Sequence, residues 1–311
     1  MSRHLPARLG LRVFCFTLIA LLSACGGSSG SSSSTNNQQT GPMTGGGTAE
    51  SKTFFDQTLT AADGEDIAFT VFVPENPNGK ALPLVIHGHG FGLSRLKDME
   101  NPDPINGFVQ NAEITAQIAK RAWLEAGFYV ISFDQRGFGD STGSITVMDP
   151  EIDCRNVSQI IDWAETNLAN LGRRNNDPVI GSIGLSYGGG FQTVCGSADK
   201  RFDALVPLAT WSHLPYSLYP NETPKSLWLD ILGVVSAGNL EPYLITAFLE
   251  ATTTGDINQD ALERLAGNGP RSFCQKQMGR TPASADALFI QSANDVLFNM
   301  NEGVENYVIE L

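Results

Sequence analysis

A serine framed by glycines is the residue of this sequence whose surroundings most clearly indicate chemistry. Ser186 lies in the run 184–188, with the sequence GLSYG, which has the pattern G-x-S-x-G. A short apolar run, 179–183, precedes it, and an apolar segment with helical character, 191–198, follows it. A strand, a tight turn bearing serine and a helix expose a hydroxyl at a corner, which is the position of a catalytic nucleophile.

The neighbouring residue types fit that chemistry. A turn this sharp crowds the backbone around Ser186, and Gly184 and Gly188 lack the Cβ atoms that would clash there. The helix that follows directs free N–H groups at the turn, where they would stabilise negative charge on a substrate oxygen. The competing interpretation is a glycine-rich turn with an incidental serine.

Composition excludes several other functions. The 311 residues carry a formal net charge of −13, which argues against nucleic acid as a partner, since phosphate backbones are bound by Lys and Arg. No spacing of His, Cys, Asp or Glu predicts a metal site, and we expect no cofactor.

The amino terminus has the pattern of a secretory signal. Arginines precede a short apolar run, 13–22, that is too short to span a bilayer, and the run ends in Leu-Ser-Ala-Cys at 22–25. This ending resembles the lipobox of bacterial lipoproteins, which implies a signal peptide over 1–24, lipid on Cys25 and a place in the bacterial cell envelope. The absence of aspartate after Cys25 favours the outer membrane. The alternative is an ordinary signal peptide with a chance cysteine.

The next residues, 25–51, are rich in Gly, Ser, Thr and Asn and predict a flexible tether. Of the remaining cysteines, Cys195 follows the nucleophile on a predicted helix, and we expect it to be a small buried apolar residue. An oxidising compartment allows one disulfide, for which Cys154 and Cys274 are the predicted pair.

Beyond the tether, 52–311 is predicted to form one domain with strands and helices in alternation. A hairpin is predicted from 54–59 and 67–73, followed by strands at 82–87, 128–133, 179–183, 204–208 and 287–291. Helices are predicted at 111–126, with Ile114, Ile118 and Ala122 along one face, at 157–168 and at 300–309. This alternation predicts an α/β fold with a mostly parallel sheet covered by helices on both faces.

One stretch breaks the alternation. Residues 212–285 contain several prolines and the helical patches 226–235 and 243–251. We interpret this stretch as a helical cap inserted between two strands, where it could shape a substrate site. The alternative is an insertion without a role in binding.

Five motifs now give a resemblance to a known family. They are HGFG at 89–92, DQRGFGDS at 134–141, GLSYGG at 184–189, the run 211–215, and NDVLF at 294–298. In this order they resemble the α/β-hydrolases and, more narrowly, the serine hydrolases that include X-Pro dipeptidyl-peptidases and cocaine esterase. The resemblance covers the chain from about residue 52 to its last residue.

The resemblance implies roles for particular residues. Ser186 would be the nucleophile, and the backbone N–H groups of Tyr187 and Phe91 would form the oxyanion hole. His89 is the alternative second donor. Asp134 and Arg136 are expected to tie down the turn that follows their strand.

Asp295, which comes just after the strand predicted at 287–291, would orient a histidine base. Asp286 precedes that strand, at the wrong edge of the sheet, and Asp230 lies in the cap.

The base itself is not found in the expected place, because in this fold it follows the acid. The histidines are His4, His87, His89 and His213, and all precede Asp295. His213 would need an unusual route to the serine. The simplest account is a chain that lacks the last strand and the histidine loop of its family's domain.

Two hypotheses follow. In the first, the chain is a lipid-anchored serine hydrolase that acts on a small ester, polyester or peptide substrate. A proline-directed aminopeptidase would need a cap carboxylate for the substrate amine, with Glu222, Asp230 and Glu241 as candidates. In the second, the chain is a catalytically inactive envelope lipoprotein that keeps the hydrolase fold for binding.

Overall fold

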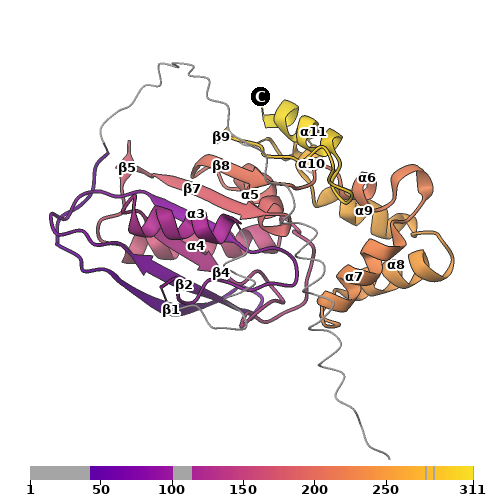
Figure 1. Cartoon of the computed structure of the whole chain (residues 1–311), viewed down its shortest axis with the longest axis horizontal. Coiled ribbons are helices and arrows are strands. Elements are labelled where there is room, and N and C mark those ends of the chain that lie inside the picture. The colour runs from indigo at the N-terminus through magenta and orange to yellow at the C-terminus, as the bar shows by residue number, and fades with distance from the viewer. Residues whose placement is uncertain (1–42, 101–113, 277–278, 283, 311) are drawn as a thin grey trace, which may run out of the picture. The chain divides into compact units, whose positions relative to one another are not determined.

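A seven-stranded sheet is the frame of this protein, here described from a computed structural model (Figure 1). The strand order is β1-β2-β4-β3-β7-β8-β9. The neighbours from β4 to β9 run parallel, whereas β1 pairs antiparallel with β2, and β2 pairs antiparallel with β4. The strands are β1 (Thr53–Thr60), β2 (Asp66–Val73), β3 (Leu84–Gly88), β4 (Tyr129–Phe133), β7 (Ile180–Leu185), β8 (Phe202–Leu208) and β9 (Asp286–Ala287), with a separate small hairpin of β5 (Arg173–Arg174) and β6 (Asp177–Pro178).

The structure describes residues 43–100, 114–276, 279–282 and 284–310. The predicted signal peptide and Cys25 lie outside this range. Within it, no helix has both the length and the apolar character needed to cross a bilayer.

The opening hairpin forms where the sequence predicts it. β1 and β2 pair from Thr53 opposite Val73 to Thr60 opposite Asp66, and the turn between them includes Gly64 with a φ of 90°. Because β2 lies between β1 and β4 while β1 is at the sheet edge, nearly all of β2 is buried, whereas β1 alternates between exposed and half-buried residues.

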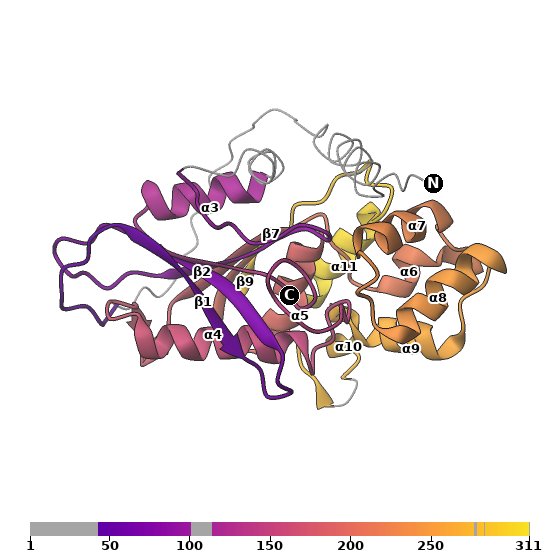
Figure 2. The same cartoon turned by 90° about the horizontal axis from the view of Figure 1, so that it is seen from below.

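Helices cover both faces of the sheet. α3 (Ile114–Leu124) lies on one face, and α4 (Asp153–Asn167) and α5 (Tyr187–Ala198) lie on the other (Figures 1 and 2). Two apolar clusters correspond to these faces. The smaller joins Phe72 and Val130 to α3, and the larger joins the opposite sides of the same strands to α4 and α5. The predicted α/β fold with helices on both faces is confirmed.

The buried side of α3 differs from the predicted one. Thr115, Ala116, Ala119 and Trp123 are buried, whereas Ile114 is 57% exposed. Trp123 decides this orientation, because its ring packs on those of Phe54 and Phe72 and its Nε1 donates to the Val73 carbonyl at 2.9 Å. Burying one large aromatic ring with its N–H satisfied outweighs burying the isoleucines.

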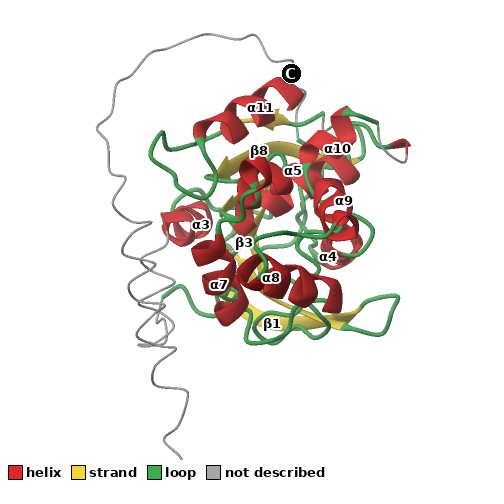
Figure 3. Cartoon of the chain, turned by 90° about the vertical axis from the view of Figure 1, so that its right-hand side faces the viewer, coloured by secondary structure: helices red, strands yellow, loops and turns green. Residues whose placement is uncertain are grey.

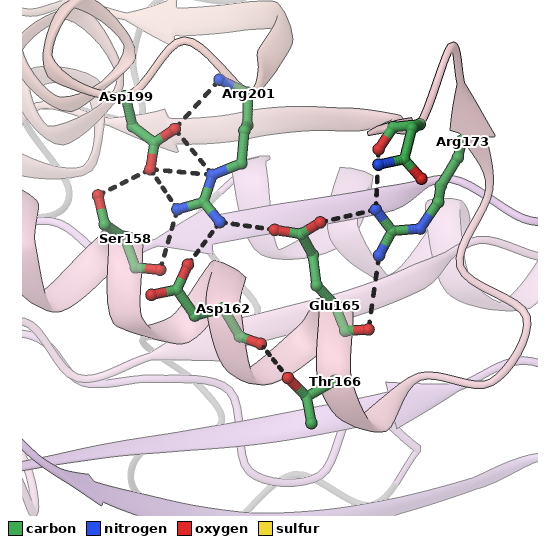
Figure 4. Close-up of polar contacts among 8 residues, drawn as sticks. Ser158, Asp162, Glu165, Thr166, Arg173, Asp199 and Arg201 are labelled. Atoms are coloured by element: carbon green, nitrogen blue, oxygen red, sulfur yellow. Dashed lines mark hydrogen bonds and ion pairs between the residues drawn. The ribbon is translucent and has the colours of Figure 1, made fainter.

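α4 is joined to the end of α5 by a polar network (Figure 4). The Arg201 guanidinium contacts Asp199, Asp162 and Glu165, and Glu165 also pairs with Arg173 at 2.7 Å. Arg201 is mostly shielded from solvent, so these charge-assisted bonds are stronger than those of an isolated surface pair. The network fixes the carboxyl end of α5 against α4.

A disulfide joins the same two helices and corrects the predicted pairing. Cys154 on α4 is bonded to Cys195 on α5, with their Cα atoms 4.8 Å apart, and Cys274 is a free, exposed cysteine. The prediction treated Cys195 as a buried thiol. It failed because the sequence does not show that α4 and α5 are neighbours on one face of the sheet.

The helices of the predicted cap follow β8. They are α6 (Leu214–Leu218), the 3-10 turn η1 (Pro220–Glu222), α7 (Ser226–Val235), α8 (Pro242–Thr253), α9 (Gln259–Gly267) and α10 (Pro270–Cys274). They gather beyond the carboxyl ends of the parallel strands (Figures 1 and 2). The helices predicted at 226–235 and 243–251 are present as α7 and α8.

The last helix, α11 (Met300–Glu310), has an unusual distribution of residues. Its inner side buries Glu302 and Asn306, which are polar. Its outer side carries an apolar stripe of Met300, Val304, Tyr307 and Val308, each at least 40% exposed. The stripe follows the i, i+4, i+7, i+8 spacing that normally faces a core.

The folded domain begins before the predicted boundary at residue 52. Residues 43–51 were predicted to be tether, but Thr44 bridges to Arg173 and Glu50 bridges to Asn76. The Glu50 carboxylate also accepts a hydrogen bond from Asn170 at 2.6 Å. Residues 43–51 are rich in small polar residues, but their backbone N–H and C=O groups can still pair with those of the domain surface.

The disulfide yields the first prediction. Replacing both Cys154 and Cys195 by Ser should lower the free energy of unfolding by about 4 kcal/mol, since the bond closes a loop with a sequence separation of 41. Urea unfolding followed by circular dichroism measures this difference. Cys274→Ser is the matched control and should change the free energy of unfolding by less than about 0.5 kcal/mol. Equal stability of the double variant and the wild type would contradict the assigned pair.

Candidate active site

Ser186 occupies the corner between β7 and α5. Its backbone has a φ of 58° and a ψ of −112°, a conformation that costs energy for any residue with a Cβ. The corner is held by hydrogen bonds. The Ser186 N–H donates to the Leu208 carbonyl at 2.9 Å, and its carbonyl accepts from Gly189 and Gly190 at 2.9 Å each. Ser186 is partly exposed.

The two framing glycines are required by close backbone contacts. A Cβ on Gly184 would lie 2.3 Å from the Gly188 carbonyl oxygen, and a Cβ on Gly188 would lie 2.0 Å from the Gly88 carbonyl oxygen. Neither contact is possible for a side-chain carbon. The loop after β3 is therefore pressed directly against the corner that carries Ser186.

Gln192 stabilises the corner by hydrogen bonds. The sequence analysis did not identify this residue. This buried α5 side chain donates from Nε2 to the carbonyls of Gly184 and Gly188 at 3.2 and 2.9 Å. Its Oε1 accepts from the Ser182 hydroxyl and the Val206 N–H at 3.1 and 2.9 Å. Polar residues on an otherwise apolar helix are the signal that could have indicated it.

The two predicted oxyanion donors lie beside the corner. The rings of Phe91 and Tyr187 pack edge to face with centroids 5.2 Å apart, so the loop after β3 and the start of α5 meet. Within the part of the chain that the structure describes, neither backbone N–H is used in another hydrogen bond. N–H groups without another partner are free to bind an oxygen that gains negative charge.

Aromatic rings lead from the corner to the loop that carries Asp295. The Tyr187 ring lies 6.1 Å from that of Trp211, which lies 5.6 Å from that of Phe298. The Asp295 Oδ1 accepts from the N–H groups of Leu297 and Phe298 at 2.9 Å each. The carboxylate thus orders its own loop, and its Oδ2 lies 3.4 Å from the Gln291 amide.

The other predicted carboxylates lie elsewhere. Asp286 begins β9 and is exposed. In the cap, Glu222 and Asp230 are exposed and Glu241 precedes α8, and none of the three forms an ion pair within the described residues. Nor do the described His, Cys, Asp and Glu side chains include a group of three or more that could hold a metal ion.

His87 and His89 are fully buried parts of the scaffold. His87 Nδ1 pairs with the Ser132 hydroxyl at 2.9 Å, and burial lowers the pKa of His87 to about 3. His89 Nδ1 pairs with the Gly90 carbonyl at 2.8 Å, and its Nε2 accepts from the Gln135 N–H at 3.1 Å. Burial also lowers the pKa of His89, so both rings stay neutral and shape the loop after β3.

His213 differs from these two, because its buried Nδ1 has no hydrogen-bond partner in the described structure. Burial, followed by the nearby positive charge of Arg271, lowers the pKa of His213 to about 4. The ring is therefore neutral at pH 7 and chemically able to accept a proton. No hydrogen bond joins it to Ser186 or Asp295, both of which the structure describes.

The turn that carries His213 is built around Glu302, another residue that the sequence did not reveal. The buried Glu302 carboxylate accepts from the N–H groups of Ser212 and His213 at 2.7 and 2.9 Å and from the Ser217 hydroxyl. Burial raises the pKa of Glu302. A glutamate on an amphipathic helix is ordinarily taken as exposed, so no sequence signal marked it.

Asp134 and Arg136 hold the turn after β4. Asp134 is buried, pairs with the Arg95 guanidinium and accepts from the N–H groups of Arg95 and Asp140 at 2.6 and 2.8 Å. Arg136 pairs with Asp63 at 2.8 Å. Both side chains are thus bound to other residues of the protein and stabilise this turn.

The sheet, its covering helices and the serine at the corner between β7 and α5 define an α/β-hydrolase. The X-Pro dipeptidyl-peptidase (S15) family matches residues 63–297, and the chain belongs to this family.

A curated relative matches only part of the chain. The chain is 33% identical over 142 residues to the uncharacterized 31.7 kDa protein in the traX-finO intergenic region of Escherichia coli. The aligned residues cover 46% of this chain and 41% of that protein. The chain therefore spans less than half of the length of this relative.

Solved structures share the fold. Acetyl xylan esterase 1 from Thermoanaerobacterium superposes with a TM-score of 0.55 at 14% identity, covering 87% of this chain and 78% of the esterase. The acylaminoacyl peptidase of Pyrococcus horikoshii superposes with a TM-score of 0.52 at 13% identity, covering 84% of this chain and 35% of the peptidase.

A buried carboxyl lies on the helix behind the corner. Asp153 on α4 is 6% exposed and pairs with the Thr146 hydroxyl. Burial raises the pKa of Asp153 to about 7, and the nearby charge of Asp149 adds to the effect. Burial, together with the charge of Asp153, raises the pKa of the buried Tyr187 hydroxyl.

Asp153 yields a prediction of pH dependence. The pKa of this carboxyl is about 7 in the folded chain against an ordinary value of 3.8, so folding favours the neutral acid. The stability it contributes is full below the unfolded pKa and is lost as pH rises through about 7. Between about pH 5 and about pH 8.5 the loss is about 3 kcal/mol.

Asp153→Asn removes the titration and should reduce this pH dependence by that amount. Urea unfolding at the two pH values measures it. Asp149→Asn removes a charge that adds to the raised pKa of Asp153 and should reduce the pH dependence only in part. Parallel pH profiles for the wild type and Asp153→Asn would contradict the assignment.

Proposed function

We propose that this chain cleaves an ester or amide bond through an acyl-serine intermediate. The Ser186 Oγ attacks the substrate carbonyl carbon, and the oxygen that gains negative charge is bound by the N–H groups of Tyr187 and Phe91. The leaving group departs with the proton that the Ser186 hydroxyl loses. Water then attacks the acyl-serine, its oxygen enters the acid product, and one of its protons returns to the Ser186 Oγ. The observation that carries the proposal is the serine held at a φ of 58° at the corner between β7 and α5. The N–H groups of Tyr187 and Phe91 make no backbone hydrogen bond within the described residues, which supports their role.

The bond cleaved can be an ester or a peptide-type amide. The S15 family supports the amide, and the acetyl xylan esterase shares the fold with this chain. Parallel assays with a nitrophenyl ester and a Gly-Pro anilide separate the two substrate classes.

A second function has its own observation. His87 and His89 are buried and engaged in hydrogen bonds, and His213 has no hydrogen bond to Ser186 or Asp295, all of them described residues. A serine without a base reacts several orders of magnitude more slowly, because the residues of a triad act as a unit. A chain in that condition would keep the fold for binding, as an inactive member of its family.

Labelling with a fluorophosphonate probe tests the first function. The wild type should be labelled within minutes at Ser186, and Ser186→Ala should not be labelled at all. Intact-mass spectrometry gives the stoichiometry. A folded wild type that resists the probe would instead support the inactive form.

The same assay addresses the proton acceptor. If His213 serves, labelling of His213→Ala falls by about a hundredfold or more, as expected for loss of a general base. Labelling at the wild-type rate would assign the base to another group.

We also propose that the chain is a lipoprotein of the bacterial cell envelope, anchored in the outer membrane through Cys25 and without contact to nucleic acid. The signal pattern supports this, and so does the Cys154–Cys195 disulfide, since such bonds persist in oxidising compartments.

Expression in a bacterium with a lipoprotein pathway tests the anchor. The full chain should sediment with the membrane fraction and carry a lipid-sized mass increase on the peptide that begins at Cys25. Cys25→Ser should remain unprocessed and carry no such increase. A soluble, unlipidated mature chain would contradict the anchor and favour an ordinary signal peptide.

A further inference from the structure

The N–H group of Tyr187 that is proposed to bind the oxyanion belongs to the peptide between Ser186 and Tyr187. The ψ of Ser186, −112°, sets the direction of this peptide. The left-handed conformation that a φ of 58° permits has its energy minimum near a ψ of about 47°. The observed peptide is therefore strained, and its N–H keeps its direction because neighbouring groups constrain it.

These constraints act through the first turn of α5. The Ser186 carbonyl, on the same peptide, accepts from the N–H groups of Gly189 and Gly190, so the peptide moves together with this turn. Residues 188–190 are all glycine and have no side chain to pack. Tyr187 therefore supplies the side chain that fixes this turn against the rest of the protein.

Three aromatic rings surround that of Tyr187, which is 2% exposed. The rings of Phe91 and Phe138 meet it edge on, with centroids 5.2 and 5.6 Å away, and the ring of Trp211 lies at 6.1 Å. This packing holds the ring in one orientation.

The hydroxyl end of the ring lies against a strained turn at 147–148. Burial raises the pKa of Tyr187, and the N–H groups of Met148 and Val147 act against this rise, because they lie beside the hydroxyl oxygen. Val147 and Met148 are buried and have φ values of 56° and 64°. Such values are costly for residues with large side chains, and successive N–H groups in a turn form a concavity for an acceptor oxygen. Within the described residues, neither N–H donates to a backbone carbonyl.

Hydrogen bonds from two directions fix this turn. The Thr146 hydroxyl pairs with the Asp153 carboxyl, and the Thr146 carbonyl accepts from the Asn268 side chain at 3.1 Å. The carbonyl of Asn268 in turn accepts from Trp211 Nε1 at 2.8 Å. Asn268 follows α9, and α10 contacts both α9 and α5, so the three helices lie together (Figure 3). Asn268 thus joins the turn to a ring that packs on Tyr187.

We infer that the hydroxyl of Tyr187 is a positioning group for the oxyanion site. The turn at 147–148 holds the hydroxyl, and the rigid ring carries this constraint to the backbone, where it keeps the N–H of the same residue directed at the substrate oxygen. The inference rests on the proposed acyl-serine chemistry, in which that oxygen gains its charge. It also explains a tyrosine at a place where packing of the ring alone would accept phenylalanine.

Tyr187→Phe tests the inference, since it keeps the ring and removes the hydroxyl. The kcat for nitrophenyl acetate should fall about tenfold while KM stays within about twofold of the wild-type value, because a displaced donor weakens binding of the oxyanion and not of the ester. The rate of labelling by the fluorophosphonate should fall by the same factor.

Tyr129→Phe is the matched control. Tyr129 is also fully buried, and its hydroxyl pairs with Glu50 at the start of β4, at the amino-terminal edge of the parallel strands. Both variants lose a buried hydroxyl, so both should unfold at lower urea concentration, whereas kcat should fall in Tyr187→Phe alone. An unchanged kcat in Tyr187→Phe, or an equal fall in both variants, would overturn the inference.

Hydrogen exchange measures the positioning without turnover. In Tyr187→Phe the backbone N–H groups of the peptide 184–192 should exchange at least about tenfold faster than in the wild type, and in Tyr129→Phe they should not. Unchanged exchange in Tyr187→Phe overturns the inference even when the probe labels Ser186 of the wild type. Faster exchange in a chain whose wild type resists the probe overturns the catalytic proposal instead and leaves the positioning of the turn in place.

Discussion

The contact between the loop after β3 and the corner after β7 is the constraint on which the site depends. Gly88, Gly184 and Gly188 bring three backbone segments within distances that exclude any Cβ. Because the segments are this close, the loop after β3 lies against the corner that carries Ser186. The parallel register of β3 and β7, with Gly88 opposite Gly184, sets this contact.

The remaining structure supports that contact from two sides. Beneath it, Gln192 ties the corner to β8, and the disulfide and the Arg201 network hold α5 against α4. Beyond the strand ends, the rings of Tyr187, Trp211 and Phe298 connect the corner to the acid loop. A strained serine is thereby held by packed neighbours, which is the condition for such a conformation to persist.

The elements with a strong local signal were predictable from the sequence. The hairpin, the strand that leads to Ser186 and the helices α7 and α11 follow from periodicity, glycine placement and turn residues. These features are encoded by residues near one another in the chain, so short sequence windows are enough to predict them.

What could not be predicted depends on pairs that are distant in sequence. Cys154 and Cys195 meet only because α4 and α5 are neighbours, and Trp123 orients α3 only because Phe54 and Phe72 lie within reach of its ring. Glu302 and Lys225 have ordinary surface sequences, and their roles come from carbonyls and N–H groups of other segments. Whether a histidine lies beside Asp295 likewise depends on the three-dimensional fold, which local sequence patterns do not reveal.

The outer stripe of α11 gives the molecule two opposed tendencies in solution. A net charge of −13 makes copies repel one another across a few nanometres of dilute buffer, while Val304, Tyr307 and Val308 favour adhesion once two surfaces touch. Salt shortens the reach of the repulsion and leaves the adhesion intact. We therefore expect the association of this acidic chain to depend on ionic strength, with dispersed copies in dilute buffer and clusters at high salt.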